Sequence, residues 1–91
     1  MRSLQDVIYN WLTIKLVVEK RPHDEAAEET YSLFQSILTE DHQVSHLSIE
    51  RLPESYVVHF IKEDKPSSFR FPKELAETMI AQMEQEPEKF L

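Results

Sequence analysis

The sequence predicts an α+β domain in two layers, in which a three-stranded antiparallel meander carries helices packed on one face. Two observations on the spacing of apolar residues support this prediction. Before residue 40 and after residue 72 apolar residues recur at i, i+3 and i+4, the spacing of one helix face. Between residues 45 and 72 they alternate with polar residues, which is typical of strands buried on one face. The expected order is α-α-β-β-β-α, and a chain of 91 residues is expected to form a single domain, 1–91.

The first helix is expected to start at Ser3 and to end before Pro22. Ser3 and Asp6 have the spacing of a capping box, and proline disfavours helical backbone at the residue before it. The apolar sector of this helix is wider than one sheet face needs. The residues that widen it are Tyr9, Leu12 and Leu16. They either pack against the second helix and the C-terminal tail or form a contact surface for a second copy or another protein.

The second helix is expected to run from about Asp24 to about Thr39, with Asp24 as its N-cap. Acidic side chains gather in its first turns, and no Lys or Arg lies between His23 and His42. The acids of this face are Asp24, Glu25, Glu28 and Glu29. Negative charge here suits the helix dipole and solubility, but the same face could also bind a basic partner.

Residues 45–72 are expected to form three strands, joined by turns at 53–55 and 63–66. The expected register brings the large apolar side chains to one face, because a slip by one residue would scatter them. The expected pairs are Arg51–Tyr56, Ile49–Val58 and Leu47–Phe60 in the first hairpin, and Phe60–Phe69 and Val58–Phe71 in the second.

The last helix is expected to start near Pro72 or Lys73 and to end at Pro87. Its narrow apolar stripe consists of Leu75, Ala76, Met79, Ile80 and Met83. Beyond it, residues 88–91 are expected either to dock through Phe90 or to fray.

The polar face of the sheet is expected to carry the candidates for chemistry. It displays His46, Ser48, Glu50, Val57, His59, Ile61, Ser68 and Arg70. His59 is expected between Ser48 and Arg70, with His46 diagonal to it. Two histidines and Glu50 could form a weak metal site or an acid–base pair. A solvated face without a site is the simpler interpretation, because metal sites need convergent ligands with supporting groups around them.

Composition excludes several classes of site. The chain has no glycine and no cysteine, which excludes glycine-rich phosphate loops, thiolate nucleophiles, zinc–thiolate sites and disulfides. The net charge of −7 argues against direct binding to nucleic acid. The longest apolar run is residues 16–18, too short to span a membrane, and Asp6 interrupts the region where a signal peptide would be apolar. We therefore expect a cytoplasmic protein.

Three hypotheses on function follow. The leading one is a non-catalytic protein–protein interaction or regulatory module without a cofactor, whose partner is another protein or a second copy of itself. The second is an acidic inhibitor of the immunity type, or a nucleic-acid mimic, that binds a basic partner through Glu25, Glu28 and Glu29. The third is a metal-dependent or small-ligand enzyme that uses His46, His59 and Glu50.

Overall fold

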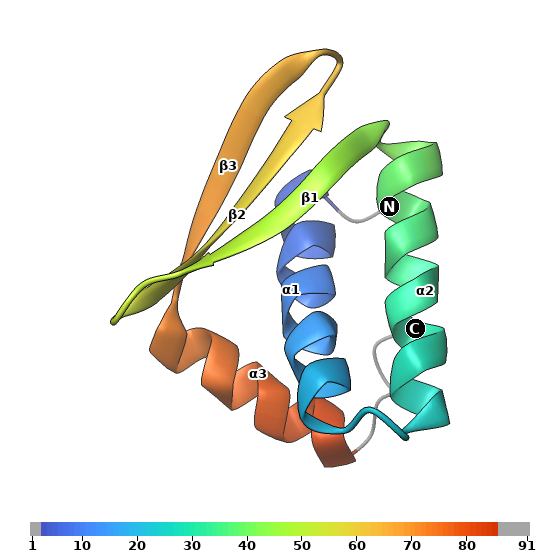
Figure 1. Ribbon diagram of the computed structural model, residues 1–91, viewed down its shortest axis with the longest axis vertical. Helices are drawn as coiled ribbons and strands as arrows, with labels where there is room; N and C mark the ends of the chain where they lie inside the picture. Colours follow the sequence, from blue (N-terminus) through green and yellow to red (C-terminus); the bar gives the residue numbers. More distant parts are fainter. Residues whose placement is uncertain (1–2, 86–91) are drawn as a thin grey trace.

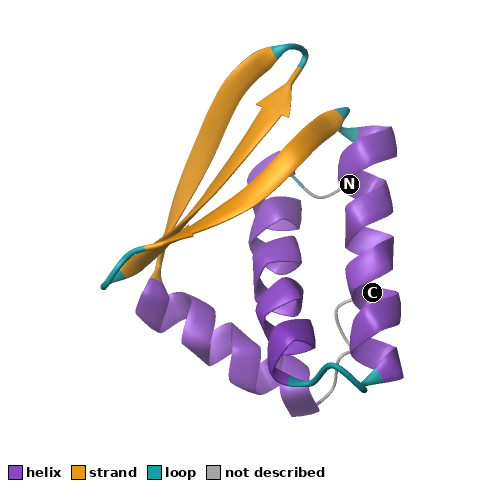
Figure 2. Cartoon of the chain, in the orientation of Figure 1, coloured by secondary structure: helices purple, strands orange, loops and turns teal. Residues whose placement is uncertain are grey.

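The helices and strands follow one another in the predicted order, and the α+β class with a three-stranded antiparallel meander is confirmed (Figure 1). The computed structural model describes residues 3–85. Its elements are α1 (Leu4–Lys20), α2 (Glu25–Ser36), the π-helix η1 (Ile37–Asp41), β1 (Val44–Arg51), β2 (Ser55–Lys62), β3 (Lys65–Pro72) and α3 (Lys73–Gln85). Figure 2 shows the helices gathered on one side of the sheet.

Side-chain caps begin the first two helices where the sequence predicts them. The Ser3 Oγ accepts a hydrogen bond of 3.2 Å from the backbone N–H of Asp6. The Asp24 Oδ1 accepts one of 3.1 Å from the N–H of Ala27. Each cap supplies an acceptor for an N–H group that the helix itself leaves unpaired.

The second helix continues past its predicted end at Thr39, because its last turn is wound as the π-helix η1. The N–H of His42 donates to the carbonyl of Ile37 over 3.2 Å, a bond five residues back along the chain. The Thr39 hydroxyl donates to the carbonyl of Gln35, and this back-bonding accompanies the wider turn. Gln43 then leaves the helix with a φ of 55°, a conformation usually given to glycine.

The first hairpin has the predicted pairs Arg51–Tyr56 and Ile49–Val58. Leu47 and Phe60 do not form the predicted one-to-one pair, because a β-bulge between Ser45 and Ser48 places residues 46 and 47 together opposite residue 60. The bulge shifts the alternation by one residue, so Val44 is buried on the core side, opposite Lys62.

The second hairpin is paired two residues away from the predicted register. The observed pairs are Tyr56–Phe71, Val58–Phe69 and Phe60–Ser67. The reason is a two-residue turn at Glu63 and Asp64, where a turn over 63–66 was expected. Both turn residues have positive φ angles, 52° and 65°, as a type I′ turn requires. A shift of two residues leaves every side chain on its predicted face.

The core lies between the sheet and the three helices, with α1 in contact with both α2 and α3. Leu12 is fully buried and Leu16 is 8% exposed. The half-buried Tyr9 stacks on Phe71 at 5.1 Å between ring centroids, and its Oη donates to the carbonyl of Leu75 over 2.9 Å. Leu12 and Leu16 therefore pack inside this chain, the first of the two alternatives for the wide apolar sector, whereas Tyr9 is only partly covered.

The α3 helix begins at Lys73 as predicted, but its apolar stripe is narrower than expected. Ala76 is buried, and Met79 and Ile80 pack against the core. The Leu75 side chain is 57% exposed and does not join the core. Its backbone carbonyl accepts the hydrogen bond from the Tyr9 hydroxyl. The Met83 side chain, the predicted stop at Pro87 and the predicted docking of Phe90 lie outside the part of the chain described here. None of the helices within residues 3–85 combines the length and the apolar content needed to cross a membrane.

Candidate functional site

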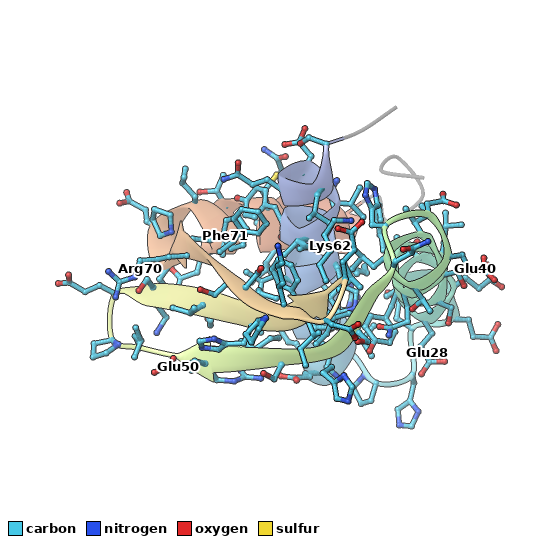
Figure 3. All side chains as sticks on the ribbon, turned by 90° about the horizontal axis from the view of Figure 1, so that it is seen from above. Glu28, Glu40, Glu50, Lys62, Arg70 and Phe71 are labelled. Carbon is cyan, nitrogen blue, oxygen red and sulfur yellow. The ribbon has the colours of Figure 1, made fainter. Side chains whose placement is uncertain are left out.

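The face of the sheet that points away from the helices carries the polar residues that the sequence singles out. The register forms two rows across the three strands, Glu50–Val57–Arg70 and Ser48–His59–Ser68. Arg70 therefore lies opposite Val57. The prediction that it pairs with His59 is wrong, because β2 and β3 are paired two residues away from the predicted register. Figure 3 shows Arg70 and Glu50 at one end of the molecule, and Glu28 of α2 and Glu40 of η1 at the other.

Two of the three side chains in the metal-site hypothesis come together. The His59 Nε2 lies 2.9 Å from the Glu50 Oε1, with both side chains about half exposed. His46 does not join them; it sits in the bulge with a φ of 56°, and its Nδ1 lies 3.1 Å from the Ser45 hydroxyl. Within residues 3–85 no three histidine or acidic side chains are placed to share a metal ion. What the structure provides here is an exposed ion pair, formed when His59 is protonated.

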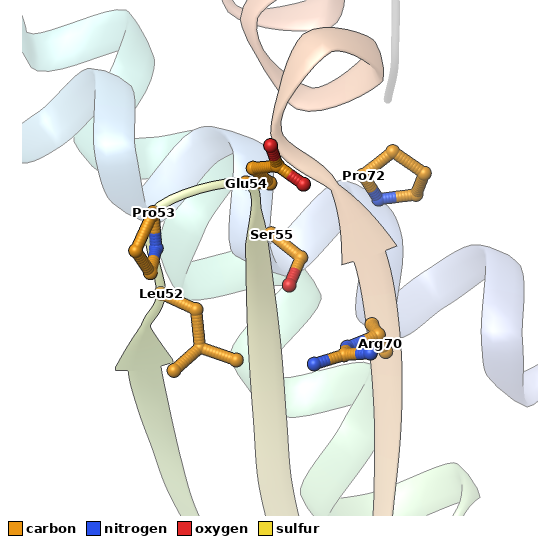
Figure 4. Close-up of a pocket in the computed structure, with 6 residues that line it drawn as sticks. All are labelled: Leu52, Pro53, Glu54, Ser55, Arg70 and Pro72. Atoms are coloured by element: carbon orange, nitrogen blue, oxygen red, sulfur yellow. The ribbon is translucent and has the colours of Figure 1, made fainter.

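A pocket of about 620 Å³ lies on this face, where β1 turns into β2 and β3 meets the start of α3 (Figure 4). We call it the loop pocket; it is lined by Leu52, Pro53, Glu54, Ser55, Arg70 and Pro72. Two backbone hydrogen bonds of 2.9 Å hold its rim: Leu52 N–H donates to the carbonyl of Ser55, and Lys73 N–H to that of Glu54. These bonds fix the loop to both the sheet and the last helix.

Two polar side chains in the loop pocket have no partner among residues 3–85. Ser55 is 8% exposed, and its hydroxyl makes no hydrogen bond to any described residue. The exposed Arg70 guanidinium has no hydrogen-bond or ion-pair partner within residues 3–85 either. Figure 4 shows the Ser55 hydroxyl and the Arg70 guanidinium directed into the same space. Sequence reasoning placed Arg70 on this face but missed Ser55, which it assigned to a turn.

A second hollow, of about 330 Å³, follows the outer edge of β1. We call it the edge groove; its lining residues are Trp11, Lys15, Glu19, Tyr31, Gln35, Leu47, Ser48, Ile49 and Arg51. Its walls are held by polar contacts between elements. The Arg51 guanidinium donates to Glu19 over 2.6 Å, and the Lys15 ammonium lies 5.3 Å from the centroid of the Tyr31 ring.

The two edges of the sheet differ in their free backbone groups. Leu52 N–H bonds to the Ser55 carbonyl, and bonded pairs alternate along an antiparallel ladder. The N–H and C=O groups of Ile49 and Arg51 therefore point away from β2, into the edge groove. On β3 the alternation counted from the two-residue turn directs residues 66, 68, 70 and 72 outward. Two of these are Pro66 and Pro72, so the outer edge of β3 has lost two N–H donors.

The acidic face of α2 keeps three of its four predicted carboxylates. Glu25, Glu28 and Glu29 are exposed and line a shallow hollow of about 420 Å³ together with Ser32. Asp24 is half-buried and occupied as the N-cap, with the Arg21 guanidinium 3.8 Å away. The described residues give the other three no ion-pair partner.

Comparison of the chain with models of known protein families, with curated proteins and with solved structures finds no match. The function is therefore argued from the loop pocket, the edge groove and the acidic face alone.

Proposed function

We propose that this chain is a non-catalytic protein–protein interaction module, and that it joins a second copy of itself through the free edge of β1. The observation that carries the proposal is the difference between the two sheet edges. Prolines interrupt the donors of β3, whereas β1 contains no proline and presents the backbone groups of Ile49 and Arg51. An edge with free N–H and C=O groups is a template for one more strand. We also propose that the protein acts in the cytoplasm.

A second copy suits this edge because the edge is complementary to itself. An antiparallel pair centred on Ile49 would place the two Ile49 residues opposite each other. It would also place Ser48 of each copy opposite Glu50 of the other, so that a hydroxyl donor faces a carboxylate acceptor. No like charges then lie directly opposite each other. Ile49 is half-buried in the free chain, so pairing would cover its remaining apolar surface.

The mass of the protein in solution, measured by sedimentation over a range of concentrations, tests the proposal. We expect a dimer that strengthens with salt, because each chain carries a net charge of −7. Arg51→Pro removes one outward N–H and should give monomers. Arg51→Gln is the matched control, since it loses the same contact with Glu19 but keeps the N–H; it should remain dimeric. Ser68→Pro, at an outward position of β3, should also remain dimeric.

A wild-type protein that stays monomeric at all concentrations and salt levels would overturn the proposal. A dimer that survives Arg51→Pro would exclude the β1 edge as the contact. Circular dichroism should first show that the variants are folded. We expect this because Arg51 is exposed and its ion pair lies at the surface.

The acidic face supports a second candidate function, an inhibitor or nucleic-acid mimic that binds a basic partner. Its support is that Glu25, Glu28 and Glu29 are exposed around one hollow. Oligolysine is a suitable probe: binding should weaken steeply with salt and be lost when all three residues are changed to Gln. A control that changes Glu63, Glu74 and Glu77 to Gln removes the same charge from other elements and should keep the binding. The two candidates therefore differ in the sign of their salt dependence.

A further inference from the structure

We propose that the loop pocket binds a carboxylate carried on a small apolar group. The pocket lies away from the edge groove, and the proposal does not depend on self-association. Its apolar wall comes from Leu52, Pro53 and Pro72, and two polar groups without a partner in the described part of the chain come from Ser55 and Arg70. Small-ligand sites commonly combine an apolar lining with a few convergent polar groups in this way.

The Ser55 hydroxyl is the first indication of a ligand. Most side-chain hydroxyls that are largely buried bond to a protein group or to water, so one that lacks a protein partner and faces a pocket marks a place for a ligand oxygen. Ser55 is more than nine-tenths buried, lacks a protein partner among the described residues, and points into the pocket (Figure 4). A ligand oxygen placed beside it would accept the missing hydrogen bond.

The Arg70 guanidinium is the second indication. The observed register pairs Ser55 with Pro72 and Val57 with Arg70, so Ser55 and Arg70 are diagonal neighbours on one face. The backbones of diagonal neighbours on adjacent strands lie about 7–8 Å apart, within reach of an arginine side chain. Its planar fork of donors matches the two oxygens of a carboxylate. One oxygen could therefore accept from both groups while the second accepts from the guanidinium alone.

The charges around the loop pocket favour a monoanion over a phosphate dianion. Arg70 is the one cationic side chain in the lining, and Glu54 is also on the rim. Figure 4 shows the Glu54 carboxylate turned toward Pro72, away from the space between Ser55 and Arg70. A single positive charge in a chain of net charge −7 balances one negative charge better than two. The apolar wall would then contact the carbon skeleton that carries the carboxylate.

Titration with isovalerate, followed in the amide NMR spectrum of the full chain, tests the assignment. We expect saturable shifts at the backbone N–H groups of Leu52, Ser55 and Arg70, with a dissociation constant of about 1 mM. Isovaleramide has the same skeleton without the charge and should not bind. Arg70→Gln should weaken isovalerate binding about tenfold or more, because it removes a charge-assisted hydrogen bond. Arg51→Gln removes an arginine elsewhere on the sheet and should leave the binding unchanged.

Ser55→Ala separates a ligand contact from a structural role. We expect it to weaken isovalerate binding several-fold and to leave the melting temperature of the free protein nearly unchanged, because the hydroxyl faces the pocket and bonds to no described residue. A serine with a structural role would lower the melting temperature when it is replaced. A short peptide ending in leucine, with a free or an amidated C-terminus, tests whether the carboxylate can come from a chain end; binding of the free form alone supports the same assignment.

Four results would overturn the proposal. The first is the absence of saturable shifts with both isovalerate and the free peptide. The second is equal binding of isovalerate and isovaleramide, and the third is isovalerate binding that Arg70→Gln leaves unchanged. The fourth is inorganic phosphate binding as tightly as isovalerate at the same residues, which would make the pocket a general anion site.

Discussion

The indole Nε1–H of Trp11 donates a hydrogen bond of 2.8 Å to the Oε1 of Gln35, and this bond joins α1 to α2 inside the edge groove. Trp11 is 3% exposed, so its N–H has little access to water. It is also the one tryptophan in the sequence, and its fluorescence therefore reports on this contact. Gln35 acts as the acceptor that allows a large indole to be buried between two helices.

Gln35→Met should lower the free energy of unfolding by about 1 kcal/mol, because the buried indole N–H loses its acceptor while side-chain volume is nearly kept. Gln35→Glu keeps an acceptor oxygen at this position, now on a carboxylate, and should lose less. Urea unfolding followed by Trp11 fluorescence measures both. Equal losses in the two variants would show that the hydrogen bond contributes nothing.

The turn between β2 and β3 can be stabilised. Glu63 and Asp64 both hold positive φ angles without being glycine or asparagine, and each such residue costs on the order of 1 kcal/mol. Replacing the pair by Asn-Gly should raise the free energy of unfolding by about 1–2 kcal/mol. Changing both residues to Ala removes the same two charges but keeps the backbone cost, so it should give no gain. If the alanine variant is stabilised as much as the Asn-Gly variant, charge is the cause and the backbone argument fails.

Tyr9 should make stability depend on pH in the alkaline range. Burial raises the pKa of the Tyr9 phenol above its usual value of 10.0. Above pH 10 the unfolded chain releases this proton while the folded chain retains it, so the free energy of unfolding falls as the pH rises through the raised pKa. Below pH 10 the contribution is fully present.

Tyr9→Phe tests this sign. It removes the hydrogen bond to the Leu75 carbonyl, so it should lower the free energy of unfolding by about 1 kcal/mol at neutral pH. Above pH 10 its stability should decline less steeply than that of the wild type, and the two curves should converge. Tyr31 and Tyr56 are present in both proteins and cancel from the comparison. Parallel curves would contradict the prediction.

The His59–Glu50 pair should contribute little to stability. Both side chains are about half exposed, and ion pairs at the surface are worth about 0–1 kcal/mol. Glu50→Gln should therefore change the free energy of unfolding by less than about 1 kcal/mol. With no third ligand among the described residues, zinc or nickel should not raise the melting temperature of the wild type. A stoichiometric metal-dependent increase that Glu50→Gln abolishes would restore the metal-site hypothesis.

Hydrophobic spacing was sufficient to predict the elements and the faces of the sheet. Capping signals at Ser3 and Asp24 placed the helix starts, and the two-residue period placed Val58 and Phe71 toward the core. What this period cannot distinguish is a shift of two residues, because both registers bury the same face. The turn chemistry that normally resolves this was missing, since a type I′ turn built without glycine or asparagine gives no signal in the sequence.

The candidate sites were harder to predict than the fold. The bulge that displaces His46 from His59 depends on a positive φ angle at a histidine, which composition does not reveal. The wide apolar sector of the first helix is visible in the sequence but the elements that cover it are not, so the sequence leaves open whether residues such as Leu12 pack internally or form a contact surface. Ser55 became a candidate only when the loop, β3 and the start of α3 were seen to meet around it.

The prolines of β3 also decide how far any assembly through this sheet can extend. They stand where an N–H would point outward, so they cost the sheet no internal hydrogen bond. Two chains joined at β1 would form one sheet of six strands whose outer strands are both β3. Such a pair has two-fold symmetry and uses the β1 edge of both chains. Only the two β3 edges, with their prolines, would be left to add a third chain. The same two residues would thus favour a finite dimer and disfavour a fibre.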